Sequence, residues 1–101
     1  MDTTQLVKDI KARFNINYQK EQLREKYTAK LIFADQGGLW KATPELIGFL
    51  SSNNKQHIVI LDTYENPIKV DVNQLQLKLR ETYSMVMEQW HAEYSALEKN
   101  R

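Results

Sequence analysis

The last quarter of the chain carries one long apolar stripe at helical spacing. Its members recur at alternating intervals of four and three residues, and Glu93 interrupts the row; they are Leu79, Tyr83, Val86, Trp90 and Leu97. This spacing predicts an α-helix. A helix over residues 74–99 is roughly 39 Å long at 1.5 Å per residue, whereas a small domain is ~30 Å across. The far end of this helix is therefore expected to overhang the body of a single copy.

An overhanging apolar stripe predicts a partner surface. We expect this surface to comprise Tyr83, Val86, Trp90, Tyr94 and Leu97. A second copy of the chain is the simplest partner, because most oligomers are built from identical subunits. The alternative is that the N-terminal helices fold back and cover the stripe.

The size and composition of the chain favour one α+β domain over residues 1–101. The chain has 101 residues, of which 42% are hydrophobic and 27% are charged, and its net charge is +1. It contains no cysteine, which excludes disulfides and thiolate metal sites. Neither a signal peptide nor a membrane-spanning run is recognisable, so we expect a cytoplasmic protein.

The N-terminal third is expected to be helical. Asp2 or Thr3 can cap a first helix, and Leu6, Ile10 and Phe14 form an apolar stripe at intervals of four. Residues 15–17 (Asn-Ile-Asn) are expected to interrupt it before a second, mostly polar and basic helical stretch over 18–26.

A hairpin and a short helix are predicted next. Residues 30–34 and 39–42 are expected to form two strands, with the turn provided by Gly37 and Gly38. Thr43 and Pro44 are a typical helix start, and the helix is expected to end at residues 51–54.

Two further strands should precede the long helix. Residues 57–61 are β-branched and apolar, which predicts a central strand, and residues 68–72 alternate as a half-exposed strand does. Asn73 with Gln76 can form the capping box of the long helix. The competing interpretation is a further strand over 74–79, because its leucines also alternate with polar residues.

Catalytic constellations are not recognisable in the sequence, so we expect no enzyme, no cofactor and no bound metal. The two histidines, His57 and His91, lack partners at metal-ligand spacing. Gly37-Gly38 lacks the pattern of a phosphate-binding loop.

The chain does contain candidate residues for nucleic-acid binding. Two aromatic residues lie close in sequence to lysines, and such side chains can stack on bases and contact phosphates. The candidates are Trp40, Lys41, Tyr64 and Lys69. The alternative is that Trp40 belongs to the core and Tyr64 is a half-buried loop residue.

Five segments together resemble a family of small uncharacterised proteins from cyanophages and marine metagenomes. The segments are 30–40, 44–50, 58–63, 66–70 and 87–94. The resemblance implies an Sm-like (LSm) fold: an N-terminal helix, a small, strongly bent antiparallel sheet closed as a barrel, and here an additional long C-terminal helix. The chain lacks the usual Sm loop motifs, an Asp-x-x-x-Asn loop followed by an Arg-Gly loop.

Sm-like proteins assemble into rings, and the resemblance therefore implies a homo-oligomer of roughly five to seven copies. It further implies binding of RNA, or of single-stranded DNA, in the cytoplasm of the host cell. The alternative function is a structural or assembly protein that binds a phage or host protein through the C-terminal helix.

Overall fold

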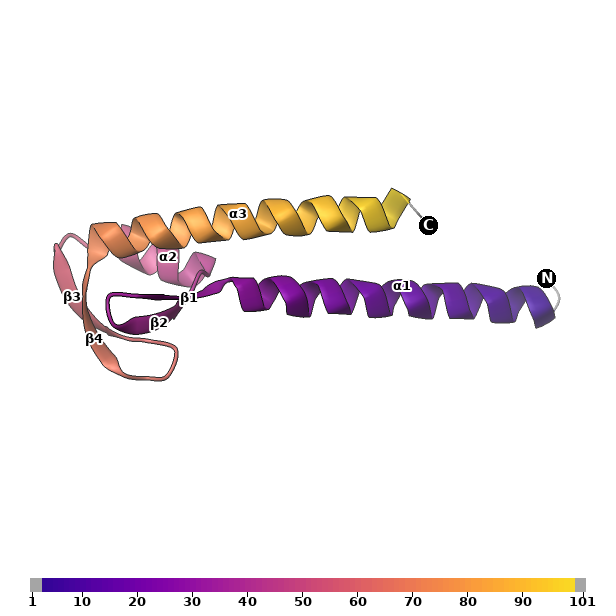
Figure 1. Ribbon diagram of the computed structural model, residues 1–101, viewed down its shortest axis with the longest axis horizontal. Helices are drawn as coiled ribbons and strands as arrows, with labels where there is room; N and C mark the ends of the chain where they lie inside the picture. Colours follow the sequence, from indigo (N-terminus) through magenta and orange to yellow (C-terminus); the bar gives the residue numbers. More distant parts are fainter. Residues whose placement is uncertain (1–2, 100–101) are drawn as a thin grey trace.

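The computed structural model describes residues 3–99 and shows an elongated α+β molecule (Figure 1). It measures 65 × 24 × 20 Å, with a radius of gyration of 19.3 Å. A compact domain of about 100 residues has a radius of gyration near 13 Å. The excess comes from a long helix that projects from a small head.

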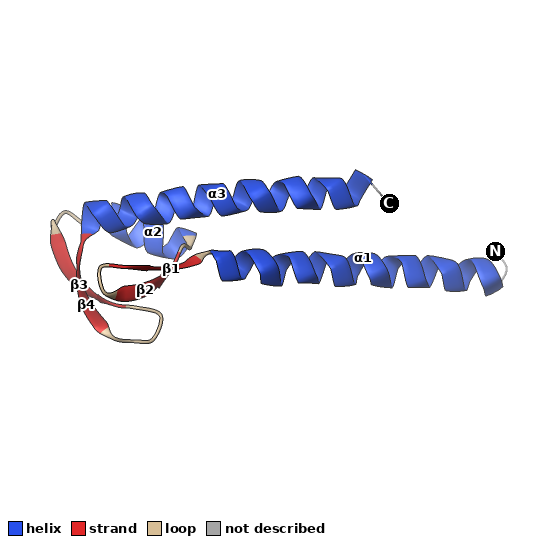
Figure 2. Cartoon of the chain, in the orientation of Figure 1, coloured by secondary structure: helices blue, strands red, loops and turns tan. Residues whose placement is uncertain are grey.

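The head contains the strands and the short helix, and two long helices extend from it (Figure 2). In chain order the elements are α1 (Thr3–Lys30), β1 (Ile32–Asp35), β2 (Gly38–Lys41), α2 (Pro44–Ser51), β3 (His57–Leu61), β4 (Pro67–Asp71) and α3 (Val72–Lys99). The predicted α+β class is therefore confirmed, with an N-terminal helix, antiparallel strands and a long C-terminal helix.

The first helix is continuous, and the predicted interruption at residues 15–17 is wrong. Neither glycine nor proline occurs between Thr3 and Lys30, and an asparagine within a helix costs less than about 0.7 kcal/mol relative to alanine. Asn15 and Asn17 are therefore tolerated. Thr3 is the first helical residue, and Asp2, the other candidate cap, lies outside the described residues.

The strands form two separate antiparallel hairpins, β1 with β2 and β3 with β4. Within residues 3–99 no strand joins these hairpins into a closed barrel. The prediction that 57–61 is a central strand is wrong, because β4 is the single strand that pairs with β3 in the described part of the chain, which makes β3 an edge strand.

The tight turn of the first hairpin uses Gln36 and Gly37, with φ of 49° and 78°, rather than the two glycines. Two successive positive φ angles are typical of a type I′ turn. Gly38 lies in β2 opposite Asp35. Because Gly38 has no Cβ, it leaves room for the Trp40 ring. A Cβ at this position would lie 2.7 Å from Cζ2 of Trp40.

The caps of the two later helices differ in how well they were predicted. Thr43 caps α2 as predicted, since its Oγ1 accepts a hydrogen bond from the Leu46 N–H at 3.2 Å. At α3, Asp71 rather than Asn73 is the cap, because Asp71 Oδ1 accepts from the Gln74 N–H at 3.0 Å. Residues 74–79 are helical, which excludes the competing strand.

The hydrophobic core lies in the head, where α2 and the first half of α3 pack against the hairpins and the end of α1. Its fully buried large side chains include Tyr27, Trp40, Leu50, Leu75 and Leu79. None of the helices in the described part combines the length and the apolarity that crossing a membrane requires.

Candidate interaction surface of the helical hairpin

The second half of α1 and the second half of α3 form an antiparallel helical pair (Figure 1). Tyr27 stacks on Trp90, with the ring centroids 6.0 Å apart and the planes inclined by 13°. Lys20 pairs with Glu98 at 3.3 Å, close to the end of α3. The Tyr27–Trp90 stack and the Lys20–Glu98 ion pair set the register of the pair.

A polar cluster closes one side of this pair. Lys26 Nζ donates a hydrogen bond to Glu93 Oε1 at 2.7 Å. This bond lowers the pKa of Glu93 and raises the pKa of Lys26. A hydrogen bond to Glu93 also raises the pKa of Tyr27. Glu93 interrupts the apolar row of α3. Its carboxylate is the acceptor that holds α1 against α3.

The predicted partner surface on α3 is largely occupied within the chain. Val86 is buried, Trp90 is half-buried against Tyr27, and Tyr83 and Leu97 are half-buried. Only Tyr94 retains substantial exposure, at 38%. The expectation that the far end of α3 overhangs the molecule is thus wrong, because α1 lies along it.

The overhang belongs to α1 instead. Residues 3–19, called the arm below, precede the Lys20–Glu98 ion pair and extend about 25 Å at 1.5 Å per residue. In Figure 1 the N-terminal end of α1 reaches far beyond the C-terminal end of α3. Most of the arm therefore extends beyond the described part of α3, and only its end, at Asn17 and Gln19, lies beside that helix.

The arm nevertheless carries apolar side chains on one side. We call them the arm stripe: Leu6 (50% exposed), Val7 (43%), Ile10 (57%), Phe14 (70%) and Tyr18 (57%). At 100° per residue these five fall within a sector of about 120°. The residues that pack on α3, such as Leu23 and Tyr27, lie about 140° away from the middle of that sector.

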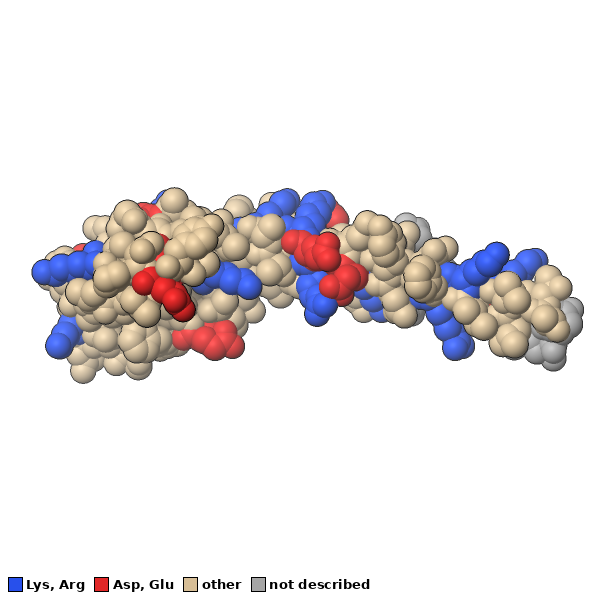
Figure 3. Space-filling view, turned by 90° about the horizontal axis from the view of Figure 1, so that it is seen from below, with Lys and Arg blue, Asp and Glu red and all other residues tan. Residues whose placement is uncertain are grey.

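The side of α1 that carries the arm stripe continues toward the head as a shallow hollow. We call this hollow the receiving face: Arg24, Glu25, Thr28, Ala29 and Ile32. Arg24 also lines an adjoining groove between α1 and α3, beside Trp90 and Tyr94. Figure 3, seen from below, shows acidic and basic side chains next to each other about midway along the molecule and basic ones toward the free end of α1.

The candidate nucleic-acid residues do not converge. Trp40 is only 1% exposed, and its Nε1 donates a hydrogen bond to the Asp35 carbonyl at 2.8 Å, so it is a core residue with no ring face open to a base. Lys41 is half-buried. Tyr64 is 72% exposed in the β3–β4 loop, and Lys69 is exposed on β4 beside a hollow lined by Phe49 and Val59.

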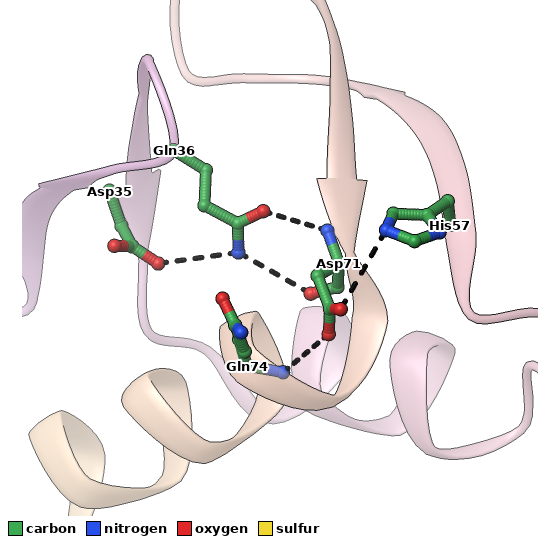
Figure 4. A network of polar contacts seen from close by, with 5 residues as sticks. All are labelled: Asp35, Gln36, His57, Asp71 and Gln74. Atoms are coloured by element: carbon green, nitrogen blue, oxygen red, sulfur yellow. Dashed lines mark hydrogen bonds and ion pairs between the residues drawn. The ribbon is translucent and has the colours of Figure 1, made fainter.

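A polar network links the two hairpins (Figure 4). The Gln36 side chain accepts from the Asp71 N–H at 2.7 Å and donates to the Asp71 carbonyl at 3.4 Å. His57 Nε2 lies 3.7 Å from Asp71 Oδ2. Asp71 is thus engaged by the turn of the first hairpin, by its cross-strand neighbour His57 and by the Gln74 N–H of α3, which it caps. The network is a structural joint, and the residues in it include no hydroxyl or thiol nucleophile.

A second joint centres on Asp62, which is 9% exposed. Its carboxylate accepts from the N–H groups of Asn66 at 2.9 Å, Leu39 at 3.1 Å and Tyr64 at 3.0 Å. These donors, Asn66 first, lower the pKa of Asp62. Among residues 3–99 no three metal-binding side chains gather around a common point.

Sequence reasoning identified part of the arm stripe but not its exposure. The spacing of Leu6, Ile10 and Phe14 was evident, and Tyr18 continues it by four more residues. The expected break at 15–17 hid that continuation.

Comparison with known proteins adds no relative: no protein family, curated protein or solved structure matches the chain.

Proposed function

We propose that this protein is a non-enzymatic assembly protein that works by associating with further copies of itself. The observation that supports the proposal is the arm stripe, five apolar side chains on one helix that remain 43–70% exposed in the described chain. Complete burial of one such side chain contributes about 1.5–3 kcal/mol. An isolated helical segment of this length is marginal in water, so a partner that buries the stripe also stabilises the arm.

A sedimentation equilibrium series over increasing protein concentration tests this function. We expect an average mass above the 11.9 kDa of one chain, rising with concentration. Phe14→Glu should shift the population toward the monomer, because it places a charge in the middle of the stripe. Asn15→Glu is the matched control, since Asn15 is exposed on α1 outside the stripe. A wild-type mass of one chain at every concentration would falsify the proposal.

A second candidate is nucleic-acid binding by an Sm-like ring of roughly five to seven copies. The charge of α1 favours it: the helix has seven lysine or arginine residues and three acidic ones, a net charge of +4. In such a ring, the edges of the two hairpins would pair with neighbouring copies. Single-stranded RNA or DNA added to the same sedimentation series should then co-sediment at low salt and dissociate at high salt.

A further inference from the structure

We infer that the arm of one copy packs antiparallel on the receiving face of a second copy, forming a two-fold symmetric dimer. The inference rests on the proposed self-association and names the partner surface. Each copy contributes one arm and one receiving face, so the dimer contains the same contact twice, as two-fold symmetry requires.

The arm stripe and the side of α1 that receives it are equal in length. The arm stripe runs from Leu6 to Tyr18, about 18 Å along the helix axis. The side of α1 from Tyr18 to Lys30, which includes most of the receiving face, has the same length. A two-fold axis close to Tyr18 therefore superposes the arm of each copy on the receiving face of the other.

The arm stripe and the receiving face point to the same side of α1. Glu21, Glu25 and Thr28 lie in the same sector of α1 as the arm stripe, at 100° per residue. One straight helix thus presents both halves of the contact on one side. The pairing needs no bend in α1 and leaves the contact with α3 in place.

One charge pair also matches in this register. The arm carries Lys8, Lys11 and Arg13 against Asp9. The receiving face contains both Arg24 and Glu25, and Glu21 beside it already pairs with Arg24 at 2.7 Å. Lys11 and Glu25 are each seven residues from Tyr18. With the two-fold axis at Tyr18, Lys11 of one copy therefore lies at the level of Glu25 of the second copy, on the same side of the helix pair. Within the described chain, neither Lys11 nor Glu25 forms an ion pair.

The apolar contacts agree with this register. Val7 comes opposite Ala29 of the second copy, where the hollow is lined by small side chains, and Ile32 closes its end. Phe14 falls between the levels of Glu21 and Glu25, beside the aliphatic part of Arg24. The exposed stripe of each copy is thereby covered by the other copy.

Cross-linking provides the test, because the chain has no cysteine and introduced thiols react alone. The variant Lys11→Cys/Glu25→Cys is treated with a short bis-maleimide, and products are separated by mass. Residues 11 and 25 of one copy are about 21 Å apart along α1, beyond the reach of the reagent. Across the two-fold axis, residue 11 of one copy and residue 11 of the second copy are also about 21 Å apart, and so are the two copies of residue 25. We expect a covalent dimer from the double variant and none from either single variant.

The outcomes separate this inference from the proposed function. If the double variant cross-links no better than the single variants while wild-type protein still sediments above the monomer mass, the arm pairing is wrong and self-association stands. If Val59→Cys cross-links instead, the copies join through the edges of β3, which also overturns the pairing. If wild-type protein is monomeric, both fail, and the stripe must serve a different protein.

Charge exchange provides a second readout in solution. Lys11→Glu should weaken the dimer by about tenfold in Kd, because it places two acids opposite each other. Lys11→Glu/Glu25→Lys should restore the affinity. Lys8→Glu is the matched control, since it makes the same charge change at the level of Thr28 of the second copy, where no acid lies opposite. Equal weakening by Lys8→Glu and Lys11→Glu, without restoration, would contradict the pairing.

Discussion

At the residue scale, the Trp40 ring occupies the space that a side chain at position 38 would need. A Cβ on Gly38 would lie 2.7 Å from Cζ2 and 3.0 Å from Cε2 of the Trp40 ring. The ring cannot move away easily, because it is buried and hydrogen-bonded to the Asp35 carbonyl. Gly48, in contrast, has no atom within 4 Å of the corresponding position and lies in α2.

The two glycines should therefore respond oppositely to alanine. Gly38→Ala should lower the free energy of unfolding by about 1–3 kcal/mol, as overpacking does. Gly48→Ala should raise it by about 0.5–1 kcal/mol, because alanine is the better helix former. Urea unfolding of both variants measures the difference, and equal effects at the two positions would refute this account of the Trp40 site.

Local signals predicted some residues well and others poorly. Thr43 and Pro44 act within a few residues of their own positions, so the start of α2 was readable from the sequence. The role of Trp40 was left open, because whether an aromatic ring is buried depends on α1, α3 and the second hairpin together. The cap of α3 was misplaced because Asp71 and Asn73 are both good capping residues and the end of β4 decides between them.

At the element scale, the two hairpins are joined by side chains and by a backbone hydrogen bond from the Thr63 N–H to the Leu39 carbonyl at 2.8 Å, and not by a shared sheet. Asp62 holds the β3–β4 loop against β2 through the Leu39 N–H. Its lowered pKa means that the native protein binds a proton there less readily than the unfolded chain does. The stabilisation from Asp62 is therefore fully present above the unfolded pKa, about 3.9, and is lost as pH falls toward the folded pKa.

Asp62→Asn should flatten the acid limb of the stability profile. We expect the loss of unfolding free energy between about pH 5 and pH 3 to be smaller in the variant than in the wild type. Glu65→Gln is the control, because it removes one acid from the same loop without removing a carboxylate that accepts backbone hydrogen bonds. Urea unfolding at several pH values measures the profiles, and parallel wild-type and Asp62→Asn curves would contradict the assignment.

The element order was predictable because each helix and strand has its own periodicity and turn residues. The pairing of the elements was not. The apolar character of β3 is equally compatible with a central strand and with an edge strand that has two exposed apolar side chains, Val59 and Leu61. Sequence periodicity does not distinguish these cases, since it reports the face of a strand and not its neighbours.

At the scale of the whole molecule, one chain has more helix than it can cover. The length of α3 predicted an overhang, but the longer reach of α1 transfers the uncovered surface to residues 3–19. The sequence therefore indicated that apolar surface would remain exposed. The Tyr27–Trp90 stack and the ion pairs to α3 set how α1 lies along α3, and so place the exposed surface on the arm.

Hydrogen exchange of the arm amides tests most directly whether the stripe is covered by another copy. Exchange in residues 6–18 should slow as protein concentration rises, and it should accelerate on dilution or in Phe14→Glu. The amides of α3 near Leu79 serve as an internal reference, because they belong to the core of one copy. If the arm amides exchange as fast as those of an unfolded peptide at every concentration, the arm has no partner of its own kind and the account of self-assembly is wrong.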